Sequence, residues 1–209
     1  MKRAIAVTAL LPTLPLLTVV LATPASAAPP PPPSTATAKK ELAKLKVRRE
    51  GSLSGYSRAK FPQWIDQGHN CNTREIVLKR DGAKVRVGSD CYPTKGRWYS
   101  PYDGKYLTNP HKVDIEHLVA LAEAWRSGAR SWSTAKRRAF ANDLRHPELW
   151  TADDPINRQK GGKDPARWLP PRRAFRCTYI RAYVSVKYVW GLSVDSAEKR
   201  AISAVLKHC

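Results

Sequence analysis

Three side chains that can do acid–base or metal chemistry lie together in the segment Asp114-Ile115-Glu116-His117. On an extended strand Asp114 and Glu116 share one face, and His117 begins the turn that follows. An imidazole with a pKa of about 6.5 can take a proton from water, and a carboxylate can hold a hard divalent cation. Hydrolysis of a phosphodiester needs both functions. The segment therefore predicts metal-assisted hydrolysis, with a salt-bridged strand end as the alternative.

A second polar segment runs from Asp153 to Asp164 with the sequence Asp-Asp-Pro-Ile-Asn-Arg-Gln-Lys-Gly-Gly-Lys-Asp. A proline suits the first turn of a helix, and paired glycines weaken or stop one. We therefore expect a short helix over residues 156–160, preceded by a short strand over 149–151.

The two segments together resemble the secreted HNH endonuclease family. Asp-Ile-Glu-His-Leu-Val-Ala-Leu is followed by a helical insertion and then by Asn-Arg-x-Lys-Gly-x-x-Asp-Pro-x-x-Trp-Leu-Pro-Pro, a strong match over residues 114–171. Upstream, residues 71–74 and the stretch from Asp90-Cys91 to Tyr102-Asp103-Gly104 are similar to the amino-terminal part of that family. The resemblance implies an α+β fold with a ββα-metal core, in which two short antiparallel strands and a helix surround one divalent ion, Mg²⁺ or Mn²⁺.

The resemblance also implies the metal ligands and the base. His117 aligns with the general base that activates water. Glu116 and Asn157 align with the two metal ligands, and Asp114 aligns with a supporting acid that binds the ion directly or through water. Carboxylate, amide and water oxygens suit hard ions better than zinc.

Basic residues near Asn157 are candidate phosphate-binding groups. Lys160 lies one helical turn away at i+3, where its ammonium can reach the same phosphate and assist catalysis. Arg158 and Lys163 are further candidates. The alternative for such residues is a solvated, charged helix face.

One position departs from the family pattern, because Glu148 stands where an HNH motif has the asparagine that braces the loop of the base. A glutamate could accept a hydrogen bond from the backbone or from the imidazole of His117, and the second arrangement would raise the pKa of the base. His146 and Asn142 are alternative braces.

The charge of the chain indicates an anionic partner. Its formal net charge is +20 and its pI is about 10.2, a footprint typical of nucleic-acid binding. Cell-wall polymers, glycans and lipid head groups are alternative partners. Phosphate contacts carry no base information, so we expect little sequence preference and binding that salt weakens.

The amino terminus predicts export. Residues 1–27 have a basic start, an apolar run and an Ala-x-Ala site ending at Ala27, as a secretory signal peptide does. Pro12 and Pro15 argue against the alternative, a retained membrane anchor. The Pro, Ser, Thr and Ala residues over 28–38 favour an extended linker. Residues 39–209 are then expected to form a single nuclease domain, with its core motif at 113–171.

The cysteines agree with an oxidising compartment, because Cys71, Cys91, Cys177 and Cys209 form an even set. Four cysteines allow three pairings. The sequence-local choice, Cys71 with Cys91 and Cys177 with Cys209, closes the shortest loops, although spacing alone does not select it. A structural zinc site is the competing interpretation, and the lack of a Cys-x-x-Cys pair in the sequence argues against it.

The remaining elements follow from apolar spacing and turn residues. A hairpin with strands at 75–78 and 83–87 is expected around Asp81-Gly82, tied by a disulfide. Tyr56, Phe61, Trp64 and Ile65 are expected in the core. The other predicted elements are a strand over 113–119 and helices over 38–47, 120–128, 133–144, 174–189 and 196–207.

These patterns lead to one functional expectation and two alternatives. We expect a secreted, extracellular, monomeric, metal-dependent endonuclease that acts on DNA, with RNA as a further substrate, and that does not bind membranes once the signal is removed. A cationic extracellular protein that binds nucleic acid or cell wall through a degenerate nuclease site is the first alternative. A secreted toxin domain with the same chemistry is the second.

Overall fold

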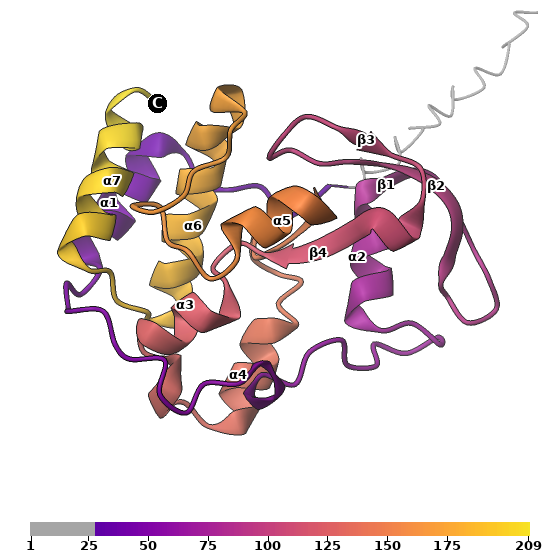
Figure 1. Ribbon diagram of the computed structural model, residues 1–209, viewed down its shortest axis with the longest axis horizontal. Helices are drawn as coiled ribbons and strands as arrows, with labels where there is room; N and C mark the ends of the chain where they lie inside the picture. Colours follow the sequence, from indigo (N-terminus) through magenta and orange to yellow (C-terminus); the bar gives the residue numbers. More distant parts are fainter. Residues whose placement is uncertain (1–27) are drawn as a thin grey trace, which may run out of the picture.

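Helices and two small sheets build residues 28–209, the part of the chain that the computed structural model describes (Figure 1). The expected signal peptide, residues 1–27, lies outside the described residues. The α-helices are α1 (Thr35–Lys44), α2 (Thr73–Asp81), α3 (Leu121–Arg126), α4 (Thr134–Ala141), α5 (Asp154–Lys160), α6 (Arg176–Trp190) and α7 (Ser196–Lys207). The strands are β1 (Gly82–Val87), β2 (Pro93–Tyr99), β3 (Tyr106–Leu107), β4 (Val113–His117) and β5 (Leu149–Asp153). The short 3-10 helices are η1 (Arg58–Lys60), η2 (Pro110–Lys112), η3 (Ala129–Ser131) and η4 (Arg173–Phe175).

Helices α1, α6 and α7 pack against one another at one end of the molecule (Figure 1). Helix α1 buries Leu42, and Leu45 directly after it is also buried, as their spacing predicts. It begins at Thr35, inside the segment expected to be a linker, because the Ser34 side chain accepts a hydrogen bond from the Thr37 amide at 3.2 Å and caps the helix. No helix within residues 28–209 is long and apolar enough to cross a membrane.

The two-stranded sheet and α5 lie between this helical end and the three-stranded sheet (Figure 1). Strand β4 pairs antiparallel with β5, and His117 stands opposite Leu149. Helix α5 follows β5 directly and ends at Lys160. The next residue, Gly161, has a φ of 51°, which glycine adopts more easily than other residues. The strands and the helix that the sequence predicts here are confirmed.

The hairpin expected within residues 75–87 is wrong. Residues 73–81 form helix α2, because the Asn72 side chain accepts from the Glu75 amide at 3.1 Å while the Glu75 carboxylate accepts from the Asn72 amide at 2.7 Å. This reciprocal capping box starts a helix where the apolar run was too short to indicate one. Strand β1 pairs instead with β2, and β3 completes that antiparallel sheet.

Both disulfides follow the sequence-local pairing. Cys71 and Cys91 join the start of α2 to the turn between β1 and β2, with 5.1 Å between their Cα atoms. Cys177 and Cys209 join α6 to the residue beyond α7, with 5.6 Å between their Cα atoms. Because all four thiols are paired, the alternative pairings and the zinc site are excluded.

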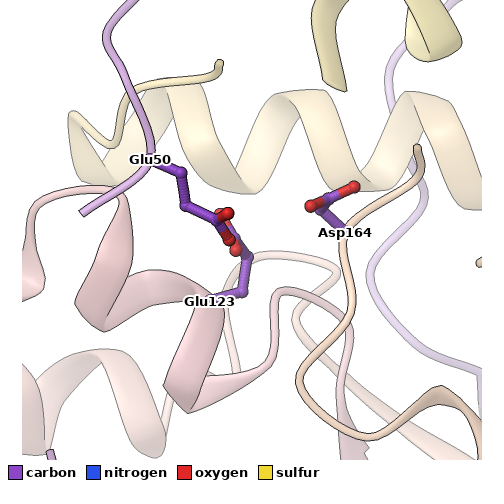
Figure 2. A group of neighbouring side chains, drawn as sticks. All are labelled: Glu50, Glu123 and Asp164. Atoms are coloured by element: carbon purple, nitrogen blue, oxygen red, sulfur yellow. The ribbon is translucent and has the colours of Figure 1, made fainter. Parts of the chain in front are cut away.

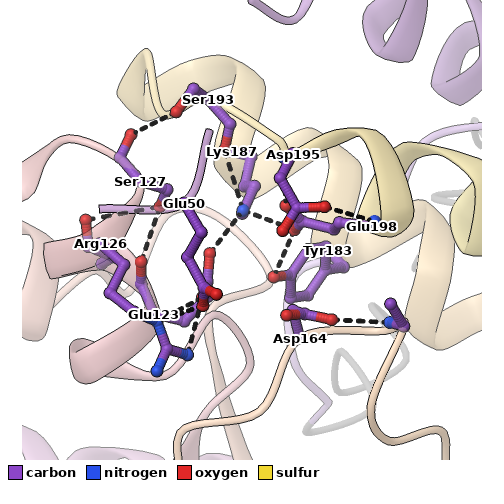
Figure 3. A network of polar contacts seen from close by, with 12 residues as sticks. Glu50, Glu123, Arg126, Ser127, Asp164, Tyr183, Lys187, Ser193, Asp195 and Glu198 are labelled. Atoms are coloured by element: carbon purple, nitrogen blue, oxygen red, sulfur yellow. Dashed lines mark hydrogen bonds and ion pairs between the residues drawn. The ribbon is translucent and has the colours of Figure 1, made fainter. Parts of the chain in front are cut away.

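A buried ionic network ties α3, α6 and α7 together (Figure 3). The Lys187 ammonium lies 2.9 Å from a Glu123 oxygen and 2.5 Å from a Glu198 oxygen. The Tyr183 hydroxyl donates to the same Glu198 carboxylate at 2.7 Å. One ammonium therefore holds carboxylates from two helices against a third.

The carboxylates of Glu50, Glu123 and Asp164 gather beside this network (Figure 2), with oxygens within 4.8 Å of one another. Arg126 pairs with Glu50 at 2.6 Å and with Glu123 at 3.0 Å. Arg167 pairs with Glu50 and lies 3.6 Å from Asp164. Guanidinium groups thus neutralise the cluster, which makes it a link between chain segments rather than a cation site.

Candidate active site

The imidazole of His117, at the end of β4, is buried and held from two sides. Its Nε2 lies 2.9 Å from the carbonyl oxygen of Ala141, the last residue of α4. A carbonyl only accepts hydrogen bonds, so Nε2 carries the proton and Nδ1 keeps its lone pair. The ring also packs against Trp64, with ring centroids 5.5 Å apart. This arrangement leaves one basic nitrogen in a defined orientation.

The charge state of His117 follows from its surroundings. The pKa of the imidazole is lowered to about 3, mainly by burial; the hydrogen bond to Ala141 opposes the shift, and the positive charges of Arg58 and Lys160 add to it. The ring is therefore neutral at neutral pH, and it can accept a proton.

Lys160 is completely buried beneath the site rather than exposed on a helix face. Its ammonium forms an ion pair with Glu116 Oε1 and donates to the backbone carbonyl of His117 at 3.2 Å. Burial raises the pKa of Glu116, and the charge of Lys160 opposes that shift. The expected contact between Lys160 and a phosphate is not what the structure shows, because the Glu116 carboxylate engages the ammonium.

Asn157, on α5, is hydrogen-bonded to Asp114, the residue that the resemblance aligns with a supporting acid. Its amide nitrogen donates to Asp114 Oδ2 at 2.9 Å. The amide oxygen of Asn157 therefore remains to act as an acceptor or ligand. Asn157 and Glu116 line the same cavity, so β4 and α5 bring together the two predicted metal ligands.

Glu148 braces the chain just beyond the base. Its carboxylate accepts from the Val119 amide at 3.0 Å, and its backbone carbonyl accepts from the Leu118 amide at 2.8 Å. Burial raises the pKa of Glu148 well above its usual value. Of the two arrangements expected for this glutamate, the backbone contact is present. The contact with the imidazole is replaced by the Ala141 carbonyl, and the pKa of His117 is lowered rather than raised.

The alternative braces have other contacts. The Asn142 side chain accepts from the Ile65 amide at 3.1 Å and from the Thr73 hydroxyl at 2.7 Å, so it holds α4 to the amino-terminal segment. His146 pairs with Asp143 at 2.7 Å. Both side chains shape the surroundings of the site without touching the base.

The two remaining candidates for phosphate binding differ in position. Arg158 lines the cavity, but its guanidinium is paired with Asp154 one turn earlier on α5. Lys163 is exposed, and its ammonium donates to the Gln159 carbonyl at 2.8 Å, so it closes the end of the helix. Only Arg158 of this pair faces the site.

An open cavity of about 280 Å³ joins these groups, and two of its lining residues come from the amino-terminal segment. They are Tyr56 and Arg58, at the start of η1. Sequence reasoning placed Tyr56 in the core and overlooked Arg58. The only local signal was an arginine among aromatic residues, which is common at protein surfaces.

Comparison with known proteins shows the family of this chain. Residues 79–205 match the family described as GmrSD restriction endonucleases, C-terminal domain. The chain belongs to this family. The part that matches the GmrSD C-terminal domain contains β4, β5 and α5, and with them every predicted catalytic, metal-binding and phosphate-binding residue. Tyr56 and Arg58 precede it. The family is nuclease-related, which agrees with the resemblance found in the sequence.

A relative of this GmrSD family member extends the likeness beyond the matched domain. An uncharacterized secreted protein of Arthroderma benhamiae is 50% identical over 191 residues, which cover 91% of this chain and 94% of the relative. No solved structure matches the chain significantly.

Proposed function

We propose that this protein is a secreted, metal-dependent endonuclease of the HNH type, which hydrolyses phosphodiester bonds of DNA or RNA with little sequence preference. The observation that carries the proposal is the placement of His117, Glu116 and Asn157 on one cavity, with Nδ1 of His117 unprotonated. The nuclease-related family and the secreted relative support it.

The local fold supports the HNH assignment. Two antiparallel strands, β4 and β5, are followed by α5. The base His117 and the candidate ligand Glu116 lie on β4, and the second candidate ligand, Asn157, lies on α5. This is the order of a ββα-metal core. The short strands position side chains of adjacent residues, and the helix supplies the second ligand across from them.

The oxygen donors fit a hard divalent cation such as Mg²⁺ or Mn²⁺. Glu116 offers a carboxylate whose Oε1 is held by Lys160, which leaves the second oxygen for an ion. Asn157 offers an amide oxygen, because Asp114 engages the amide nitrogen. When bound, the cation would neutralise charge on the scissile phosphate and on the leaving oxygen.

Residues of the chain itself would carry out the other steps. His117 Nδ1 takes the proton of the attacking water, while the Ala141 carbonyl keeps the proton on Nε2 and stabilises the imidazolium that forms. A new P–O bond forms and the opposite P–O bond breaks, and the leaving 3′-oxygen takes a proton from water, which leaves a 5′-phosphate and a 3′-hydroxyl. Lys160 holds Glu116 in place, and Glu148 holds the backbone after His117.

The proposal is tested with the purified mature protein and plasmid DNA or total RNA, with Mg²⁺, with Mn²⁺ and with EDTA. His117→Ala should lower the cleavage rate about 100-fold or more, the usual contribution of a general base. His111→Ala is the matched control, because that exposed histidine lies outside the cavity.

Equal cleavage by the wild type and His117→Ala would remove His117 from the mechanism. Tight binding of nucleic acid by the wild type without cleavage in any metal would favour a cationic binding protein with a degenerate site. The contact between the Glu148 carboxylate and the Val119 amide argues against a degenerate site, because it braces the loop after the base as the usual asparagine of an HNH motif would.

A further inference from the structure

We propose that Arg58 binds the scissile phosphate in this cavity. The inference rests on the proposed function and assigns its phosphate-binding cation to a residue outside the part of the chain that matches the family, residues 79–205. Hydrolysis of a phosphodiester needs a cation or donor at the oxygens that gain charge, in addition to the base.

Arg58 lines the same cavity as His117, Glu116 and Asn157. A phosphate held in this cavity would therefore lie beside the Arg58 guanidinium as well as beside the candidate base and metal ligands.

Arg58 is available to a phosphate, because the other cations of the site are engaged. The Lys160 ammonium is buried against Glu116, and the Arg158 guanidinium is paired with Asp154. Within residues 28–209 no carboxylate lies within 4 Å of the Arg58 guanidinium. It donates one hydrogen bond, to the neutral side-chain oxygen of Gln63 at 2.7 Å. Its remaining N–H groups form a planar fork that matches two phosphate oxygens.

Arg58 lies on a turn that is anchored by neighbouring residues. Next to it, the Tyr56 ring packs against Trp125 and Phe61, with ring centroids 6.0 Å and 6.3 Å apart. Phe61 is buried, and the Lys60 carbonyl accepts from the Arg137 guanidinium at 2.8 Å. The backbone that carries Arg58 is held in place in this way, so the side chain starts from a defined position beside the cavity.

The test compares Arg58→Ala with Lys60→Ala. Both remove one exposed positive charge from η1, but Lys60 lies over the Trp125 ring and does not line the cavity. Cleavage of a fluorescein-labelled oligonucleotide in Mg²⁺ should fall about 100-fold in kcat/KM for Arg58→Ala and change little for Lys60→Ala. Arg58→Lys should recover only part of the rate, because an ammonium cannot form the two parallel bonds.

Two further measurements separate phosphate binding from a structural role. In EDTA, fluorescence anisotropy should show weaker binding of the same oligonucleotide by Arg58→Ala than by Lys60→Ala. Millimolar guanidinium ion should restore part of the activity of Arg58→Ala and leave the wild type unchanged. If Arg58→Ala lowers the melting temperature, the comparison is made with Arg58→Gln, which keeps a side chain able to bond Gln63.

The outcomes distinguish this inference from the proposed function. If Arg58→Ala matches Lys60→Ala in cleavage and binding while His117→Ala is inactive, Arg58 is not the phosphate ligand and the endonuclease assignment stands. If the wild type does not cleave, or His117→Ala cleaves equally well, the proposed function fails and this inference fails with it.

Discussion

At the scale of single residues, the buried pair of Lys160 and Glu116 shapes the site most. The side chain of Lys160 is fully buried and that of Glu116 is 8% exposed. A charge in such a place is tolerated only when it is paired and hydrogen-bonded. The ammonium therefore orients Glu116 and compensates its charge, and it does not line the cavity.

The pair predicts a strong effect on stability. Lys160→Met leaves the Glu116 carboxylate buried without its cation, so the free energy of unfolding should fall by about 3 kcal/mol or more. The double variant Glu116→Gln/Lys160→Met should recover a large part of that loss. Urea denaturation in EDTA measures both, with Lys163→Met as an exposed lysine control. Equal stabilities of the single and double variants would show that the pair is not coupled.

At the scale of elements, the end of α4 connects the base to the amino-terminal segment. The Ala141 carbonyl holds the imidazole of His117 at 2.9 Å. The next side chain, Asn142, donates to the Pro62 carbonyl at 2.8 Å and accepts from the Ile65 amide at 3.1 Å. One turn of chain thus fixes the base and the segment that packs on it and carries Trp64.

Asn142→Ala should loosen this connection. It leaves the Ile65 amide without its acceptor and removes the shorter of the two contacts of the Thr73 hydroxyl donor, and an unpaired buried donor costs about 1 to 3 kcal/mol. We expect the free energy of unfolding to drop by about 2 kcal/mol, and proteases to cut within residues 58–65 faster. Limited proteolysis followed by mass spectrometry locates the cuts. Cuts at wild-type rates would mean that other contacts hold the segment.

At the scale of the whole molecule, the buried network of Lys187 links stability to pH. Burial raises the pKa of Glu198 to about 7, Lys187 opposes the shift, and the negative charge of Glu123 adds to it. One ammonium faces two carboxylates, so the second carboxylate keeps its proton more readily in the folded state than in the unfolded chain.

The sign of the pH effect follows from this shift. The unfolded chain releases the Glu198 proton near the ordinary pKa of 4.5, whereas the folded protein holds it up to about pH 7. Stability from this group is therefore present below pH 4.5 and is lost as the pH rises to 7, by up to about 3 kcal/mol. Glu198→Gln, which keeps an acceptor for Tyr183, should remove that loss. Urea unfolding at pH 5 and pH 7.5 checks it, and equal pH dependence of the two proteins would contradict it.

Local patterns predicted much of the fold and part of the site. Helix α7 occupies the expected residues 196–207, because the two residues of its capping box, Asp195 and Glu198, lie close together in the sequence. Helix α2 was missed although Asn72 and Glu75 carry the same signal, because the turn residues that follow also suit a hairpin. The segment of the base was found because its three functional residues are neighbours in the chain.

The sequence by itself determined the chemistry available here: a histidine beside a glutamate on a strand, an asparagine on a short helix, and a large excess of positive charge. Only the tertiary structure decided which charges can meet a substrate. Glu116 pairs with Lys160 across 44 residues of chain, and Arg58 reaches the cavity from a segment that precedes the family match. Burial and pairing depend on such distant contacts, and no local pattern of residues encodes them.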